Sequence, residues 1–293
     1  MGFDVGGDAP SARDWIAQGA YFAPEPGHSI FFHRVGEGPP TLLLHGFPTW
    51  SYDYAEVAMA LRREFDVIAP DFLGYGASAK PKGRVFSVGG AAQMIEDLVS
   101  HLGLREANLV IHDYGAIVGQ ELLDRRRKGA LSFKIGSVVL MNCSIPFSHY
   151  RPTATMKLLM TPLLGSLAAS RLTKEKIRAG LNSARGRAKL SESAFEELWR
   201  GIAREGGHKI SHRLLRYNRE RALHAPRWEE ALFSFEGRVK LIWGVEDPVS
   251  GAHVLEAARS KLPRAEIAEL PGVGHFPPSE APARVASEIR AFL

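Results

Sequence analysis

An aspartate stands where a predicted strand turns directly into a predicted helix. Residues 109–116, Leu-Val-Ile-His-Asp-Tyr-Gly-Ala, run from an apolar strand through Asp113 into a helix with no loop between them. A junction of this kind exposes its apex residue at the carboxyl edge of a sheet, where a nucleophile can reach a ligand. The chain contains no Gly-x-Ser-x-Gly that would supply a serine there instead. The alternative is that Asp113 only caps the helix that follows it.

Two more side chains with the chemistry of a hydrolytic site follow later strands. Asp247 comes shortly after a buried strand and a Gly turn, and His275 lies in a Gly/Pro loop before the last helix. A single loop Asp or His is usually just solvated. The chain order Asp113, Asp247, His275, however, is that of a nucleophile, an acid and a base in one class of catalytic triad. We therefore expect His275 to act as a general base that Asp247 orients.

The sequence His-Gly-Phe-Pro at residues 45–48 follows another predicted strand. Gly46 lets the backbone approach a neighbour closely, and the Phe47–Pro48 bond can be cis. Such a loop can aim the Phe47 N–H at a developing oxyanion, together with the Tyr114 N–H that follows the nucleophile. The alternative is an ordinary Gly-Pro end to a strand.

An aspartate nucleophile limits the reaction. A carboxylate that attacks an ester gives an anhydride, whereas attack on an sp³ carbon gives a stable alkyl ester that water can then hydrolyse. Asp113 therefore argues against esterase or lipase chemistry and favours opening an epoxide or displacing a halide. Neither reaction needs a metal or an organic cofactor.

These motifs resemble the α/β-hydrolase superfamily in its branch with an aspartate nucleophile, which contains epoxide hydrolases and haloalkane dehalogenases. The resemblance covers nearly the whole chain and implies a core with an inserted helical cap. Within the branch, the sequence resembles the mesoderm-specific transcript proteins and their bacterial relatives. The segments that carry this second resemblance are residues 45–54, 71–81, 112–123 and 215–219, and Gly274-His275 is a motif of the whole branch.

The resemblance also bears on the leaving group. Dehalogenases of this branch hold the halide with a Trp after the nucleophile and a second Trp or Asn, but this chain has Tyr114 and Phe47 at those positions. Epoxide hydrolases donate a hydrogen bond to the ring oxygen from cap tyrosines. Tyr217 matches the second of these, unless it only packs under the cap. The first would lie near Leu158, where there is none.

Two residues near the start of the cap are candidates to replace that missing donor. Tyr150 and His149 come earlier in the sequence than the expected position near Leu158. Either residue could reach the substrate only if the backbone at the start of the cap follows a different course. Ile111, two residues before Asp113, stands where epoxide hydrolases usually have a small residue and is closer to dehalogenases.

The leading interpretation is an epoxide hydrolase that converts a small apolar epoxide and water into a vicinal diol. A haloalkane dehalogenase, or another hydrolase with the same aspartate nucleophile, is the alternative. A third interpretation, from a different class, is a non-catalytic protein that binds a lipid or a partner. The presence of Asp113, Asp247 and His275 together argues against it.

Short apolar strands alternate with helices along most of the chain, which is typical of an α/β fold with a doubly wound, mostly parallel sheet. The alternation stops between residues 146 and 232, where we expect only helices. The prediction is therefore a core formed by residues 1–145 and 233–293 and a helical cap formed by residues 146–232. Within the cap, the apolar run 155–172 is expected to form one helix that roofs the pocket. A helix lying on a membrane surface is the alternative.

Composition narrows the remaining possibilities. The chain has 293 residues, of which 45% are apolar and 24% charged, as in ordinary globular proteins. One cysteine, Cys143, excludes an intrachain disulfide and fits a reducing compartment. No apolar run approaches the roughly 18 residues of a membrane span, and residues 1–13 lack the features of a signal peptide. The net charge is +5, but the sequence contains no nucleic-acid-binding motif that would give this charge a role in binding nucleic acid. We therefore expect a cytoplasmic protein without nucleic-acid partners.

Overall fold

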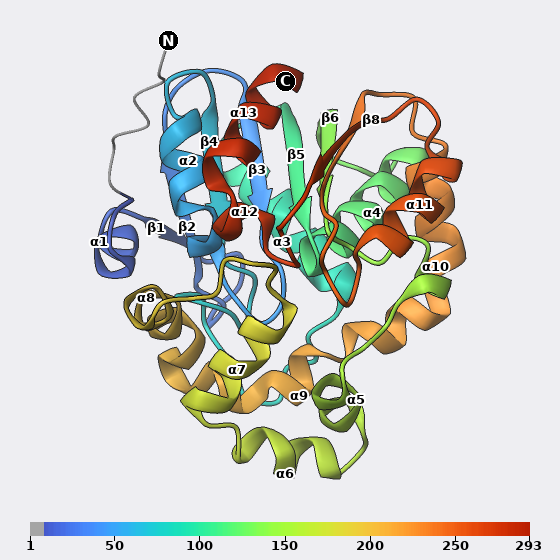
Figure 1. Ribbon diagram of the computed structural model, residues 1–293. Coiled ribbons are helices and arrows are strands. Elements are labelled where there is room, and N and C mark those ends of the chain that lie inside the picture. Colours follow the sequence, from blue (N-terminus) through green and yellow to red (C-terminus); the bar gives the residue numbers. More distant parts are fainter. Residues whose placement is uncertain (1–8) are drawn as a thin grey trace.

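The computed structural model describes residues 9–293, which form one eight-stranded sheet (Figure 1). The sheet has the order β1-β2-β4-β3-β5-β6-β7-β8. The pairs β1–β2 and β2–β4 are antiparallel, and every other pair is parallel. This confirms the predicted α/β class. The strands are β1 (Ala20–Phe22), β2 (Ile30–Val35), β3 (Pro40–Leu44), β4 (Asp66–Pro70), β5 (Glu106–His112), β6 (Lys134–Met141), β7 (Val239–Gly244) and β8 (Glu266–Leu270).

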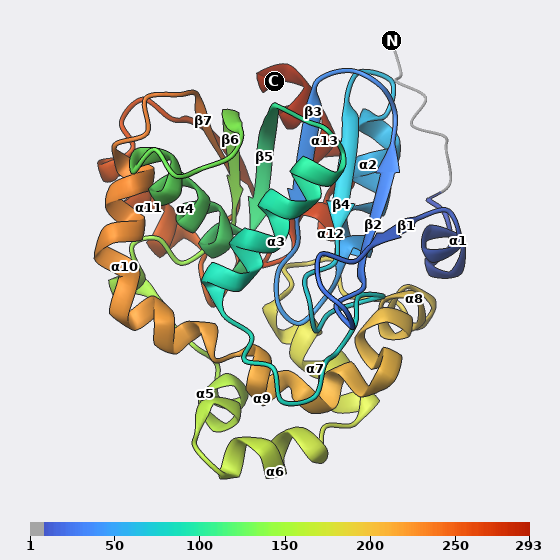
Figure 2. The same ribbon diagram turned by 180° about the vertical axis from the view of Figure 1, so that it is seen from behind.

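Helices cover both faces of the sheet, as Figures 1 and 2 show from opposite sides. One face carries α2 (Ala55–Leu61) and α13 (Pro282–Phe292), and the other carries α3 (Val88–His101), α4 (Tyr114–Arg127) and α11 (Ala252–Lys261). Because both faces are covered, the parallel strands β3, β4 and β7 are buried along nearly their whole length, whereas β8 at the edge alternates between buried and exposed positions. Two separate apolar cores result, one on each side of the sheet.

The register of the central strands brings their carboxyl ends together. Leu44 of β3 pairs with Ile111 of β5, and Met141 of β6 pairs with both His112 of β5 and Ile242 of β7. The loops after these four strands therefore meet at one edge of the sheet, which is where parallel α/β sheets form ligand sites.

Six helices and two short 3₁₀ segments lie between β6 and β7, in the predicted helical insertion. In both views they sit across the end of the sheet where the carboxyl ends of the parallel strands meet. The predicted boundaries of this segment stay a prediction, and residues 1–8 of the expected core lie outside the described residues. The segment contains η2 (Phe147–His149), α5 (Ala154–Met160), α6 (Leu164–Ser170), α7 (Lys174–Ala184), α8 (Glu192–Ala203), η3 (Arg204–Ile210), α9 (Ser211–Leu214) and α10 (Tyr217–Phe233).

The predicted single helix 155–172 is wrong, because the chain breaks into α5 and α6. Pro162 has no N–H to continue the helix, and Leu163 has a left-handed backbone with φ 62°. Residues 211–233 are likewise divided into two helices, α9 and α10, and α10 continues past Pro226 to Phe233. Three short elements outside the insertion were not predicted: α1 (Ala12–Ala17), β1 and α12 (Pro277–Glu280). A 3₁₀ turn, η1 (Ser51–Tyr54), directly precedes α2.

Within residues 9–293, no helix is both long enough and apolar enough to cross a membrane. The expected absence of a signal peptide concerns residues 1–13, of which 1–8 lie outside the described part of the chain. The cytoplasmic location stays a prediction.

Candidate active site

Asp113 occupies the turn between β5 and α4 in a strained backbone conformation. Its φ of 47° and ψ of −108° lie in a region that residues with a Cβ rarely adopt. The turn is held by the Gly115 N–H, which donates to the His45 carbonyl at 3.0 Å. A Cβ on Gly115 would lie 2.2 Å from the Leu44 carbonyl oxygen, so only glycine lets α4 begin this close to β3. The sequence placed Asp113 at the correct junction.

The loop after β3 approaches Asp113 directly. The Phe47 N–H donates to Asp113 Oδ1 at 2.8 Å, and a Cβ on Gly46 would lie 2.7 Å from the Asp113 Cβ. The Phe47–Pro48 bond is cis. Of the two amides predicted to stabilise an oxyanion, only that of Phe47 contacts the carboxylate here, while the Tyr114 N–H finds no acceptor within residues 9–293.

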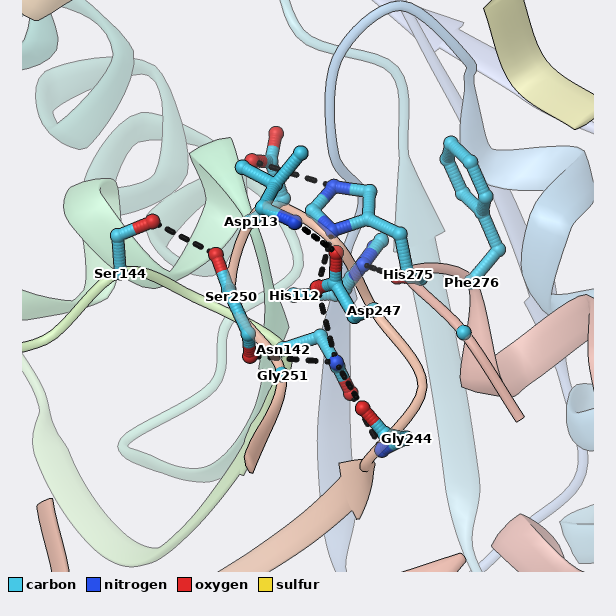
Figure 3. A network of polar contacts seen from close by, with 12 residues as sticks. His112, Asp113, Asn142, Ser144, Gly244, Asp247, Ser250, Gly251, His275 and Phe276 are labelled. Carbon is cyan, nitrogen blue, oxygen red and sulfur yellow. Dashed lines mark hydrogen bonds and ion pairs between the residues drawn. The ribbon is translucent and has the colours of Figure 1, made fainter. Parts of the chain in front are cut away.

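His275 lies between two carboxylates, as Figure 3 shows. Its Nδ1 is 2.7 Å from Asp247 Oδ2, and its Nε2 is 3.6 Å from Asp113 Oδ2. Asp247 is itself oriented by the Val249 N–H, which donates to Oδ1 at 2.7 Å, and by the Asn142 side-chain amide, which donates to Oδ2 at 3.0 Å. The three predicted residues are therefore assembled with the geometry of a nucleophile, a base and an orienting acid.

These three groups shift one another's pKa values. Burial raises the pKa of Asp113, but the hydrogen bond and the charge of His275 outweigh it and lower the pKa to about 2. Burial lowers the pKa of His275, but the charges of Asp247 and Asp113 outweigh it and hold the pKa well above its ordinary value. Asp113 is therefore ionised at neutral pH, as a nucleophile must be, and the two carboxylates stabilise the protonated form of His275 between them.

A carboxylate outside the predicted set fixes the His275 loop. Glu280 Oε1 accepts from the Phe276 N–H at 2.9 Å, and Oε2 accepts from the Gly274 N–H at 2.9 Å. Oε2 also accepts from the Gly186 N–H of the helical insertion at 2.8 Å. One side chain therefore holds both neighbours of His275 and ties them to the insertion.

Replacing Glu280 by glutamine should destabilise the fold by about 2 kcal/mol, because an amide has one acceptor oxygen for three backbone donors. The free energy of unfolding from urea titration measures the effect. The matched control is Glu256→Gln, which weakens an ion pair between exposed side chains and should change that energy by less than about 0.5 kcal/mol. Equal stability of the two variants would show that Glu280 does not hold the loop.

A cavity of about 170 Å³ opens over Asp113 and His275. Its wall is mostly apolar and comes from both the core and the helical insertion, and Asp113 is the only acidic residue that residues 9–293 contribute to it. Such a space suits an apolar ligand with few polar groups. Apolar residues that line it include Phe47, Met156, Leu159, Ile177, Leu181 and Leu214.

None of the three residues predicted in the insertion is part of the wall that residues 9–293 form around this cavity. Tyr217 begins α10 and is buried, with its ring centroid 4.8 Å from that of Tyr114. Tyr150 is half-buried and stacks on Phe147. Burial raises the pKa of both tyrosines, and the negative charge of Asp113 raises it further, so both phenols lie within electrostatic range of the carboxylate. His149 is exposed, and the structure does not bring it to the site.

Two residues near Asp113 were not predicted. Tyr75 lines the cavity, and its buried hydroxyl has no partner within residues 9–293. Arg221 is 5% exposed, lies over the ring of Tyr150 at 5.1 Å, and forms no ion pair in the described part of the chain. The sequence holds a signal for Arg221, because it stands one helical turn after Tyr217 and so shares its face. Tyr75 lies in a Gly-rich loop whose path the sequence does not reveal.

Residues 41–288 match the alpha/beta hydrolase family. The chain belongs to this family. Among its relatives is the human mesoderm-specific transcript homolog protein, which is 36% identical over 97% of this chain and 88% of its own length. This confirms the predicted resemblance.

Two other members of the α/β hydrolase family relate to the predicted chemistry. Haloalkane dehalogenase 2 from Mycobacterium bovis is 28% identical, over 89% of this chain and 90% of its own. The solved structure of epoxide hydrolase CorEH superposes with a TM-score of 0.73 at 22% identity, covering 94% of this chain and 97% of that one. The likeness to CorEH shows the fold alone. The chain is thus an α/β hydrolase.

Proposed function

We propose that this hydrolase is an epoxide hydrolase that acts through a covalent ester on Asp113. The observation that carries the proposal is an ionised aspartate, rather than a serine, at 3.6 Å from a histidine that is paired with Asp247. A carboxylate in this position forms a productive intermediate with an sp³ carbon and not with an ester.

In the first step, Asp113 attacks a ring carbon, and the bond between that carbon and the ring oxygen breaks. The departing oxygen takes a proton from a tyrosine hydroxyl, which becomes a phenolate. In the second step, His275 removes a proton from water, and the hydroxide attacks the carbonyl carbon of the Asp113 ester. The N–H groups of Phe47 and Tyr114 stabilise the resulting oxyanion. The ester bond between the Asp113 carbonyl carbon and the alkyl oxygen then breaks. The departing alkoxide takes the proton left on the oxygen that came from water, so the diol leaves and Asp113 is again a carboxylate. His275 returns its proton to the tyrosinate.

Tyr217 is our first candidate for the proton donor, and Tyr150 is the second. The negative charge of Asp113 acts on both phenols and raises their pKa values. The guanidinium of Arg221 lowers the pKa of both tyrosines and so opposes the effect of burial. A buried cation beside a phenol stabilises the phenolate that ring opening creates. Arg221 is therefore proposed as a positioning residue for the donor. Small movements of the insertion must open a path from the cavity to Tyr217.

Halide displacement is the second candidate, because haloalkane dehalogenase 2 is a full-length relative. It would need N–H donors toward a halide, but no Trp and no Asn is found among the residues that line the cavity. Four of the five indole N–H groups already donate to protein acceptors, in Ser51, Leu198, Glu121 and Ser250. These observations favour the epoxide.

We further propose that residues 146–232 act as a cap that excludes water and shapes the pocket. Met156, Leu159, Ile177 and Leu181 of this segment form part of the cavity wall. The end of α10 also packs on the core, since the Trp228 indole donates to Glu121 at 2.6 Å. The cap is thereby anchored at one end and supplies the apolar roof.

Tyr217→Phe should lower the rate of diol formation from an epoxide by about 10- to 1,000-fold, because the departing oxygen loses its proton donor. The same variant should release halide from any accepted haloalkane at an unchanged rate, because a halide needs no proton. Diol and halide assays on one preparation measure both. Tyr21→Phe, on an exposed strand far from the site, is the control. An unchanged diol rate would leave Tyr217 as a packing residue.

A further inference from the structure

Four leucines are exposed together at the tip of the helical insertion. Their exposed fractions are 48% for Leu158, 90% for Leu163, 55% for Leu164 and 47% for Leu167. They belong to α5, to α6 and to the turn between them, and we call them the leucine patch. Figures 1 and 2 both show α6 at the end of the molecule opposite the C-terminus. Scattered exposed leucines are ordinary, but a cluster at a protruding tip indicates an interaction surface.

The local backbone presents these side chains to the outside. Pro162 ends the helical path of α5, and Leu163 then takes its left-handed conformation before α6 begins. A continuous helix over residues 155–172 would bury the leucines of one face. Because the chain breaks at Pro162 and Leu163, only some of the leucines in this run are buried. Leu159 reaches the cavity wall, while Leu163 projects away from the protein.

Positive charge surrounds the leucine patch. Residues 147–191 contain nine Lys and Arg and a single acidic residue, Glu175. Four cations belong to the patch elements or to segments next to them: Lys157, Arg171, Arg216 and Arg219. Among residues 9–293, none of these four forms an ion pair with a carboxylate. Exposed leucines ringed by uncompensated cations match the surface of a bilayer with anionic headgroups.

A hollow of about 200 Å³ lies directly beside the patch. Leu163, Ser166, Arg216 and Arg219 are among its lining residues, and no acidic residue from the described part of the chain is. Arg219 donates to the Met160 carbonyl at 3.2 Å, which fixes it at the rim. Guanidinium groups bind phosphate oxygens well, so the hollow suits a phospholipid headgroup.

We propose that the leucine patch docks the protein on the surface of an anionic phospholipid bilayer. The leucines enter the region between headgroups and acyl chains, and the four cations meet lipid phosphates. The contact is peripheral, since no described helix can span a membrane. A second copy of the chain fits the patch less well, because it would bring the same positive charges face to face. The proposal does not depend on the reaction at Asp113.

Vesicle co-sedimentation tests the proposal. The full chain should sediment with vesicles of phosphatidylcholine and phosphatidylglycerol, but not with phosphatidylcholine alone, and salt should weaken the binding. Leu163→Ser should lower the partition coefficient roughly tenfold. The matched control is Val85→Ser, which removes an apolar side chain that is 62% exposed on the core and should change nothing. Lys157→Glu and Arg171→Glu should each lower binding to the anionic vesicles at least about fivefold.

Thermal unfolding confirms that each variant folds, and analytical ultracentrifugation without lipid measures self-association. Equal binding to both kinds of vesicle, or equal effects of Leu163→Ser and Val85→Ser, would overturn the proposal. So would a stable dimer that Leu163→Ser dissociates while neither protein binds vesicles, because the patch would then be a contact between copies.

Discussion

Asp113→Ala should reduce the hydrolysis of an accepted epoxide by about 10⁴-fold or more, because no covalent intermediate can form. No other acidic residue lines the cavity, so no neighbouring carboxylate can replace it. The expected residual rate is that of water positioned by the cavity alone. Diol formation under substrate saturation, followed by chromatography, measures the loss.

The fold should survive this change. Alanine removes the hydrogen bond from the Phe47 N–H but also relieves a partly buried charge, and His275 keeps its partner Asp247. We therefore expect a shift in unfolding free energy of no more than about 2 kcal/mol. Asp14→Ala on the outer helix α1 is the matched control and should retain full activity. Retained turnover in Asp113→Ala would refute the nucleophile assignment, whereas loss of turnover in both variants would point to a damaged preparation.

The sheet was largely predictable from the sequence, for a physical reason. Strands buried on both faces become mostly apolar runs bounded by turn residues, as in β4 and β7, which are buried at every position. The positions of Asp113, Asp247 and His275 followed from the same rule, because each comes just after such a strand. In an α/β fold, that placement brings residues distant in sequence to one edge.

The insertion was less predictable because its helices depend on packing. The apolar residues of 155–172 fit one helix by periodicity, yet Pro162 and the backbone of Leu163 divide it. Neither the exposure of Leu163 nor the hollow beside Arg219 follows from spacing. The partners of Glu280 and Asn142 are equally hidden, since they contact loops far away in the chain. These residues support the site through tertiary contacts that one sequence does not reveal.

The charges around His275 suggest why the two steps can follow one another. The negative charge of Asp113 is one of the causes that raise the pKa of His275. Ester formation removes that charge, so the pKa of His275 falls when a base is needed for the second step. In the wild-type protein, ester formation should stay constant down to about pH 3, because the pKa of Asp113 is about 2. Ester hydrolysis should slow as the pH falls and His275 becomes protonated.

His275→Ala should therefore trap the ester. Formation needs only Asp113, whereas hydrolysis loses its general base and should slow by about 10²- to 10⁴-fold. Burial raises the pKa of Asp113, and His275 is the main group that lowers it. Without His275, the pKa of Asp113 should therefore rise above its wild-type value. The experiment is best done near pH 8, where the carboxyl remains ionised. Intact-protein mass after exposure to separate epoxides and haloalkanes measures the adduct.

The size of the mass gain separates the two candidate reactions. A gain equal to the whole epoxide, absent from the Asp113→Ala/His275→Ala double variant, would support ring opening at Asp113. A gain equal to an alkyl group without its halogen, with no adduct from any epoxide, would replace the epoxide hydrolase proposal by a dehalogenase. An adduct that persists in the double variant would place the nucleophile elsewhere. Because the wild-type protein hydrolyses its ester, it should show the adduct only transiently, and a permanent wild-type adduct would contradict His275 as the base.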